Sequence, residues 1–129
     1  AAMQFTGLRF MRDPTRGGIA TVCSELQRAT GMGVRLMQNQ LPVRSAVQSV
    51  CDMLGYDPMY LACEGRVVAV VDKNDAQPLL KIWQSIDEGL EAEIIGTIDS
   101  KIDKVIMKTE IGGERILDEL EDDPMLRIC

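Results

Sequence analysis

Two helical segments with the same apolar spacing restrict the fold of this chain more than any other feature of its sequence. Residues 18–30 place apolar side chains at positions i, i+3, i+4 and i+7, namely Ile19, Val22, Cys23 and Leu26. The segment at about 44–54 has the same spacing in Val47, Val50, Cys51 and Leu54, with Gly55 as its C-cap. Such spacing aligns side chains along one face of an amphipathic helix. Cys23 and Cys51 are therefore expected in the core.

Strand-like runs separate these helices from a third helix, expected at about 76–88 with Asp75 as its cap. Its apolar stripe consists of Leu79, Ile82, Trp83 and Ile86. The runs typical of strands are GMGVRLM, MYLAC, RVVAVVD, AEIIGTID, DKVIMKTEI and ERILDEL. AEIIGTID and DKVIMKTEI are expected to form a hairpin or adjacent strands, and Gly112-Gly113 turns the chain into the last strand. This order predicts the α+β class, a layered mixed or antiparallel sheet with packed helices.

Composition places the chain among ordinary single domains. It has 129 residues, 46% hydrophobic and 26% charged, which is enough to bury a core. The net charge of −6 disfavours a nucleic-acid partner, which requires a basic face. No apolar run approaches the roughly 20 residues of a membrane span, and the first residues do not form a secretory signal. A cytoplasmic protein without nucleic-acid or membrane partners is expected.

The cysteine and histidine content limits the chemistry. The chain has no histidine, so histidine-based acid–base catalysis is excluded. Its cysteines, at 23, 51, 63 and 129, include no CxxC pair. Zinc sites are usually built from cysteine and histidine, so no metal site is expected.

Cys129, the last residue, is the only cysteine that the periodicity does not bury. We expect residues 1–122 to form the domain and 123–129 a flexible tail with a reactive thiol. Arg127 would lower the pKa of that thiol, whereas the neighbouring α-carboxylate would oppose the shift. The alternative is a frayed end with an incidental cysteine.

Glu64 and the RDPTRGG segment are further candidates. Glu64 lies between two apolar runs and precedes a glycine, so a partly desolvated carboxylate could serve as a general base. A turn residue pointing into water is the alternative. RDPTRGG stands at a helix entrance, where Asp13 or Thr15 could cap the helix and free N–H groups could hold an anion. A plain helix cap explains this segment equally well.

Several stretches together resemble a known family. MRDPTRGGIATVCSEL, LPVRSAVQSVCDMLGYDPMYLACEGRVVAVV, IIGTI and the final RIC are similar to the C-terminal domain of the HypE family of hydrogenase expression/formation proteins. These are carbamoyl dehydratases with a domain of the aminoimidazole ribonucleotide synthase-related type. The resemblance runs from about Phe10 to Cys129, and the combination of DPTRGG, LACEG and a terminal RIC is specific.

The resemblance implies an activity and its residues. In this family a carbamoyltransferase places a carbamoyl group on the terminal cysteine, and ATP-dependent dehydration converts it to a thiocyanate. Scaffold proteins then pass the cyanide to the iron of [NiFe]-hydrogenase. Cys129 would carry the group, and Glu64 matches the family's glutamate and would act as base. Asp13, Thr15, Gly17 and Gly18 match the glycine-rich loop and would line a cleft facing the nucleotide domain.

Two departures qualify this resemblance. Leu126 stands where the family has proline in its Pro-Arg-Ile-Cys ending. The family's ATP-binding N-terminal domain, with its acidic metal ligands and main dimer contact, has no counterpart in these residues. We therefore expect a piece of a longer protein or half of a split one, with ATP and Mg bound by the other half and no dehydration by this chain alone. The full-length family member would be a homodimer.

Two other functions stay open at this point. The first is a carrier or interaction module whose Cys129 is modified by other proteins, without catalysis of its own. The second is a relative with another ATP-dependent task, such as synthesis of aminoimidazole ribonucleotide or selenophosphate, or phosphorylation of thiamine phosphate. The cysteine tail argues against the second, because none of these tasks needs it.

Overall fold

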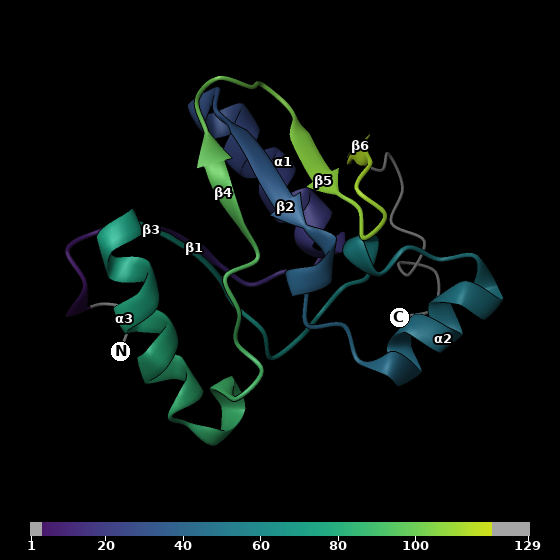
Figure 1. Ribbon diagram of the computed structural model, residues 1–129, viewed down its shortest axis with the longest axis horizontal. Coiled ribbons are helices and arrows are strands. Elements are labelled where there is room, and N and C mark those ends of the chain that lie inside the picture. Colours follow the sequence, from purple (N-terminus) through teal and green to yellow (C-terminus); the bar gives the residue numbers. More distant parts are fainter. Residues whose placement is uncertain (1–3, 120–129) are drawn as a thin grey trace.

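The computed structural model describes residues 4–119, which form two β-sheets with helices packed beside them (Figure 1). In chain order the elements are β1 (Leu8–Arg12), α1 (Gly18–Thr30), β2 (Gly33–Met37), the 3₁₀ helix η2 (Gln38–Gln40), α2 (Ser45–Leu54), η3 (Pro58–Tyr60), β3 (Val68–Val71), α3 (Lys73–Gln84), η4 (Asp87–Gly89), β4 (Gly96–Asp99), β5 (Val105–Lys108) and β6 (Glu114–Ile116). None of the helices in residues 4–119 is long and apolar enough to cross a membrane.

The sheets have mixed topology, which confirms the predicted α+β class. β1 pairs with β3 in an antiparallel two-stranded sheet. The second sheet has the order β4-β2-β5-β6, with β2 antiparallel to β4 and parallel to β5. β5 and β6 are antiparallel neighbours, as the Gly112-Gly113 turn predicts.

The predicted pairing of AEIIGTID with DKVIMKTEI is wrong, because β2 lies between β4 and β5. The connection from β4 to β5 passes over the start of β2, where the Gly33 N–H donates to the Ile102 carbonyl at 2.7 Å. A Cβ on Gly33 would lie 2.7 Å from the Lys104 carbonyl oxygen and closer still to the Ile102 side chain. A glycine at the start of β2 therefore lets the chain cross there.

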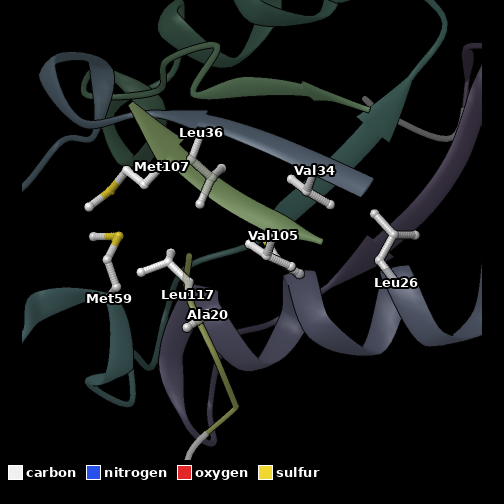
Figure 2. Close-up of a cluster of buried hydrophobic side chains, with 9 residues drawn as sticks. Ala20, Leu26, Val34, Leu36, Met59, Val105, Met107 and Leu117 are labelled. Carbon is white, nitrogen blue, oxygen red and sulfur yellow. The ribbon is translucent and has the colours of Figure 1, made fainter. Parts of the chain in front are cut away.

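The core lies between α1 and the four-stranded sheet (Figure 2). Its buried residues are Ala20, Cys23, Leu26, Val34, Leu36, Met59, Val105, Met107 and Leu117. Figure 2 shows Leu117 beside Ala20, Met59 and Val105, so the segment after β6 closes one end of this core. The prediction for α1 is confirmed in its bounds and in the burial of Cys23.

The predicted apolar stripes of the other two helices are mostly not buried. On α2 only Cys51 is buried, and on α3 only Leu79. α3 also begins at Lys73, before the predicted cap at Asp75. The reason is tertiary, since the Asp75 carboxylate accepts a hydrogen bond from the Gly7 N–H at 3.0 Å. Asp72 lies at the N-cap position and pairs with Arg9 at 2.8 Å.

The MYLAC run is not a strand. Pro58–Tyr60 form η3, and residues 61–67 follow without regular structure until β3. The Asp57 carboxylate accepts from the Met59 N–H at 3.0 Å and Pro58 occupies the first turn, which together favour a tight turn over an extended strand.

Candidate functional site

The two loops that carry the predicted site residues meet at one end of the two-stranded sheet. Because β1 and β3 are antiparallel neighbours, the loop after β1 and the loop before β3 leave the sheet at the same end. The backbone N–H of Cys63 donates to the carbonyl oxygen of Pro14 at 2.8 Å, and the Pro14 side chain is fully buried. Glu64 is thereby held next to the glycine-rich loop at 13–18.

The glycine-rich loop enters α1 through two residues with positive φ, Gly17 at 64° and Gly18 at 65°. Glycine adopts this conformation without the strain that a Cβ introduces. A Cβ on Gly18 would lie 2.6 Å from the Leu61 carbonyl oxygen and closer still to that of Met59. The missing side chain therefore lets α1 pack directly on the segment that leads to Glu64.

Asp13 and Thr15 do not cap α1, contrary to the prediction. Gly17 occupies the N-cap position, and in the part of the chain that the structure describes no side chain caps this helix. Pro14, between these two residues, is buried, and its carbonyl accepts the hydrogen bond from the Cys63 N–H. The Asp13 and Thr15 side chains are both exposed, so a carboxylate and a hydroxyl line the rim of the loop.

The Glu64 side chain is exposed, whereas the sequence predicted a partly desolvated carboxylate. Since MYLAC is not a strand, Glu64 lies in a bend and not at the end of a sheet. The following residue, Gly65, has a φ of 71°. Residues 4–119 thus present an accessible carboxylate beside the glycine-rich loop, and its desolvation would have to come from a further surface.

Side chains that the sequence analysis did not single out support this segment. Arg115 on β6 pairs with Asp57 at 2.6 Å, just before η3. The Tyr60 hydroxyl donates to the Asp118 carbonyl at 2.6 Å. Asp57 and Pro58 are residue types that favour a local turn, but no local signal connects η3 to residues some 60 positions later. These contacts tie η3 to the end of the described chain.

Cys129 and Arg127 lie outside the described residues, so their predicted roles stay predictions. Within residues 4–119, no group of three or more His, Cys, Asp or Glu side chains could hold a metal ion. The described residues therefore do not fit a Mg²⁺ site.

Of the hollows on the described surface, two are separate from these loops. One, of about 420 Å³, is lined by residues 39–44 with Glu91 and Glu93. The other, of about 520 Å³, lies between η2, the start of α2 and η3. Neither is lined by Glu64 or by the glycine-rich loop. The candidate site therefore lies on the two loops, away from these hollows.

The fold and the glycine-rich loop agree with a known family. The family described as AIR synthase related protein, C-terminal domain, matches residues 1–108. The chain belongs to this family.

Within it, the chain is similar to carbamoyl dehydratase HypE of Azotobacter vinelandii, with 39% identity over 123 residues. That match covers 95% of this chain and 36% of the relative, in its C-terminal segment. The chain thus spans about a third of the length of the curated relatives it matches. The resemblance to the C-terminal domain of HypE is confirmed.

Crystal structures of HypE have the same fold as this chain. HypE of Escherichia coli superposes with a TM-score of 0.90 and 35% identity, covering 98% of this chain and 40% of that one. HypE in complex with ATP has a TM-score of 0.87 and 34% identity, covering 95% and 38%. A HypE–HypF complex has a TM-score of 0.87 and 37% identity, covering 92% and 38%.

Proposed function

We propose that this chain is the C-terminal part of an ATP-dependent carbamoyl dehydratase of hydrogenase maturation, with the reacting group on Cys129. The observation that carries the proposal is the backbone hydrogen bond from the Cys63 N–H to the Pro14 carbonyl, which holds Glu64 beside the glycine-rich loop. Support comes from the similarity to relatives named carbamoyl dehydratase and from a similar HypE solved with ATP. Residues 1–122 form the domain in this proposal, and 123–129 form the tail that carries the thiol.

The proposed chemistry is a dehydration of the Cys129 S-carbamoyl group. The carbamoyl oxygen attacks the γ-phosphorus of ATP, which releases ADP, and the nitrogen gives the first of its two protons to water, leaving a phosphorylated imidate. The C–O bond then breaks, phosphate leaves, and the nitrogen loses its remaining proton as the C≡N bond forms. Phosphorylation is needed because an amide oxygen is a poor leaving group. The product is a thiocyanate on the same sulfur.

Glu64 is the proposed base for the nitrogen proton. Its carboxylate is exposed, so the tail can approach it from solvent. A base must come within hydrogen-bond distance of the proton it accepts, through movement of the substrate if needed. Asp13 and Thr15 on the adjacent loop rim, with Gly17 and Gly18 behind them, form the face proposed to meet the ATP-binding part.

The remaining components of the reaction lie outside this chain in the proposal. ATP and Mg are bound by the part of the longer relatives that this chain does not span, and the homodimer contact lies there too. The partners in the proposal are a carbamoyltransferase and the scaffold proteins that receive cyanide. The solved HypE–HypF complex supports a partner protein for a HypE relative. Without the ATP-binding part, the chain is expected to accept a carbamoyl group and not to convert it.

The test is intact mass spectrometry with peptide mapping of Cys129. The chain is mixed with its carbamoyltransferase, carbamoyl phosphate and ATP, and the ATP-binding part is then added. We expect a carbamoyl adduct on Cys129 first and a cyano adduct only after the second addition. Failure of Cys129 to react, while a full-length HypE does, would contradict the proposal for the isolated chain.

Glu64→Gln separates catalysis by this chain from a carrier role. The variant should be carbamoylated normally. It should convert the adduct at least about 100-fold more slowly than the wild type, the usual scale for general base catalysis. Glu88→Gln, which changes another exposed glutamate in η4, is the matched control and should convert at the wild-type rate. Equal conversion by both variants would favour the carrier or interaction module.

A further inference from the structure

We propose that Tyr60 and Arg28 form a tail anchor: they hold residues 117–119, shortly before the cysteine-bearing tail at 123–129, and so position Cys129 for its reaction. This inference rests on the proposed function, because positioning matters only if Cys129 carries the reacting group. The anchor joins three separate parts of the chain: η3, the last turn of α1, and residues 117–119.

The Tyr60 contact is the stronger half of the tail anchor. Its hydroxyl donates to the backbone carbonyl of Asp118 at 2.6 Å, across 58 residues of sequence. Directly before it, Leu117 is buried at 2% exposure and its N–H donates to the Val105 carbonyl at 2.9 Å. Burial raises the pKa of the half-buried Tyr60 and nearby Asp57 raises it further, against Arg115. The hydroxyl therefore keeps its proton and remains a donor at neutral pH.

Arg28 provides the second contact. Its guanidinium meets both carboxylate oxygens of Glu119, at 3.0 and 3.2 Å, which is a two-point geometry. Both side chains are substantially exposed, so this pair holds less strongly than the Tyr60 bond. The pair fixes the orientation of Glu119, because two parallel contacts define an orientation that a single contact does not.

The same short segment carries Tyr60 of the tail anchor and the candidate base. Tyr60 precedes Glu64 by four residues, and Cys63 between them is bonded to Pro14. Close packing of Gly18 on the Met59 and Leu61 backbone holds this segment from the other side. While the Tyr60 hydrogen bond is intact, a displacement of the tail origin relative to Glu64 therefore requires η3 to move against α1. Tail origin and base form one structural unit.

This unit limits the volume that Cys129 can search. The ten residues after Glu119 span at most about 35 Å when fully extended. A tether with a fixed origin raises the effective concentration of its end near that origin, and the gain falls as the effective tether lengthens. Releasing residues 117–119 would lengthen the tether and move its origin away from Glu64.

The first experiment measures the tail anchor without any chemistry. Backbone ¹⁵N relaxation of the 129-residue chain reports order parameters for Asp118 and Glu119. We expect rigid values near 0.85 in the wild type and values below about 0.6 in Tyr60→Phe, which removes only the hydroxyl. Tyr56→Phe makes the same change on a nearby half-buried tyrosine and should leave them unchanged. Flexible residues in the wild type, or rigid ones in Tyr60→Phe, would overturn the anchor.

The second experiment measures positioning, in the protein with its ATP-binding part. Tyr60→Phe should slow single-turnover conversion of S-carbamoyl-Cys129 about 2- to 10-fold, the range of one lost hydrogen bond. Carbamoylation by the transferase and KM for ATP should not change, whereas general structural damage would alter both. Unchanged conversion in a variant with a released tail would overturn the positioning role.

Charge exchange gives an independent check of the Arg28 contact. Arg28→Glu and Glu119→Arg should each slow conversion about 1.5- to 5-fold, the range of an exposed pair, and the double variant should recover. No recovery would contradict the Arg28 contact. If the wild type itself converts nothing, the proposed function fails, and the order parameters still decide whether the anchor exists.

Discussion

α1 and α2 carry the same apolar spacing with a cysteine at the same position of the pattern, yet they have different surroundings. α1 buries its face against the four-stranded sheet, where Cys23 is 4% and Leu26 9% exposed. α2 lies away from both sheets, beside η3 (Figure 1), with Val50 53% and Leu54 60% exposed. Amphipathic periodicity thus determines that a helix forms and which face is apolar, and it leaves open whether this domain covers that face.

Truncation of the equivalent leucines should give the largest difference between the two helices. Leu26→Ala removes buried contacts in the core and should lower the free energy of unfolding by about 2–5 kcal/mol. Leu54→Ala removes a mostly exposed side chain, and its effect should stay within about 0.5 kcal/mol. Urea denaturation of both variants measures this. Equal losses would mean that α2 is covered in solution and that the apolar faces of the two helices do not differ in burial.

Alanine substitution of the glycines at the helix ends should also cost more stability at α1 than at α2. Gly18 at the start of α1 and Gly55 at the end of α2 both have positive φ, so alanine costs about 1–2 kcal/mol at either. A Cβ on Gly55 meets nothing within 4 Å, whereas one on Gly18 collides with the Met59 and Leu61 carbonyls. Gly18→Ala should therefore destabilise more than Gly55→Ala in thermal or urea unfolding.

Gly18→Ala should also affect the candidate site. Displacement of residues 59–61 would weaken the bond between Cys63 and Pro14, so the Cys63 amide should exchange its hydrogen faster. The same amide in Gly55→Ala should exchange at the wild-type rate. Unchanged exchange in both variants would show that Gly18 does not hold the Glu64 segment.

Cys23 on α1 makes the buried face sensitive to alkaline pH. Burial raises the pKa of Cys23 from 9.0 to about 12. Because the folded state keeps the proton that the unfolded state loses, this stabilisation is complete below pH 9 and is lost as the pH rises to about 12. The expected slope is about −1.4 kcal/mol per pH unit in that window. Urea unfolding between pH 9 and 10.5 should show a shallower slope for Cys23→Ala. Parallel slopes would place Cys23 in contact with solvent.

Much of the fold could be predicted from local pattern. The spacing of Ile19, Val22 and Leu26, with glycines on both sides, predicts α1 with its observed bounds. The apolar runs around β2 and β5 predict strands, and side chains on both strands are part of the core. The pairing of β4 with β2 could not be predicted in this way, since it depends on contacts between segments about 60 residues apart.

For the candidate site, too, the sequence predicted the residues but not their arrangement. Glu64 and the glycine-rich loop stand out in the sequence by residue type and by resemblance to a family. Their proximity results from antiparallel pairing of β1 and β3 and from the bond between Cys63 and Pro14. Tyr60 carries no local signal, because its partner is a backbone carbonyl 58 residues later.

The sequence by itself determined the helices, the class of fold and the residue types available for chemistry, because these follow from periodicity and composition over a few turns of chain. Only the tertiary structure decided that α1 is covered while α2 is exposed, and that Glu64 faces solvent. It also decided that η3 joins the candidate base to the origin of the tail. Those outcomes depend on which distant segments meet, and a local pattern contains no information about its partner.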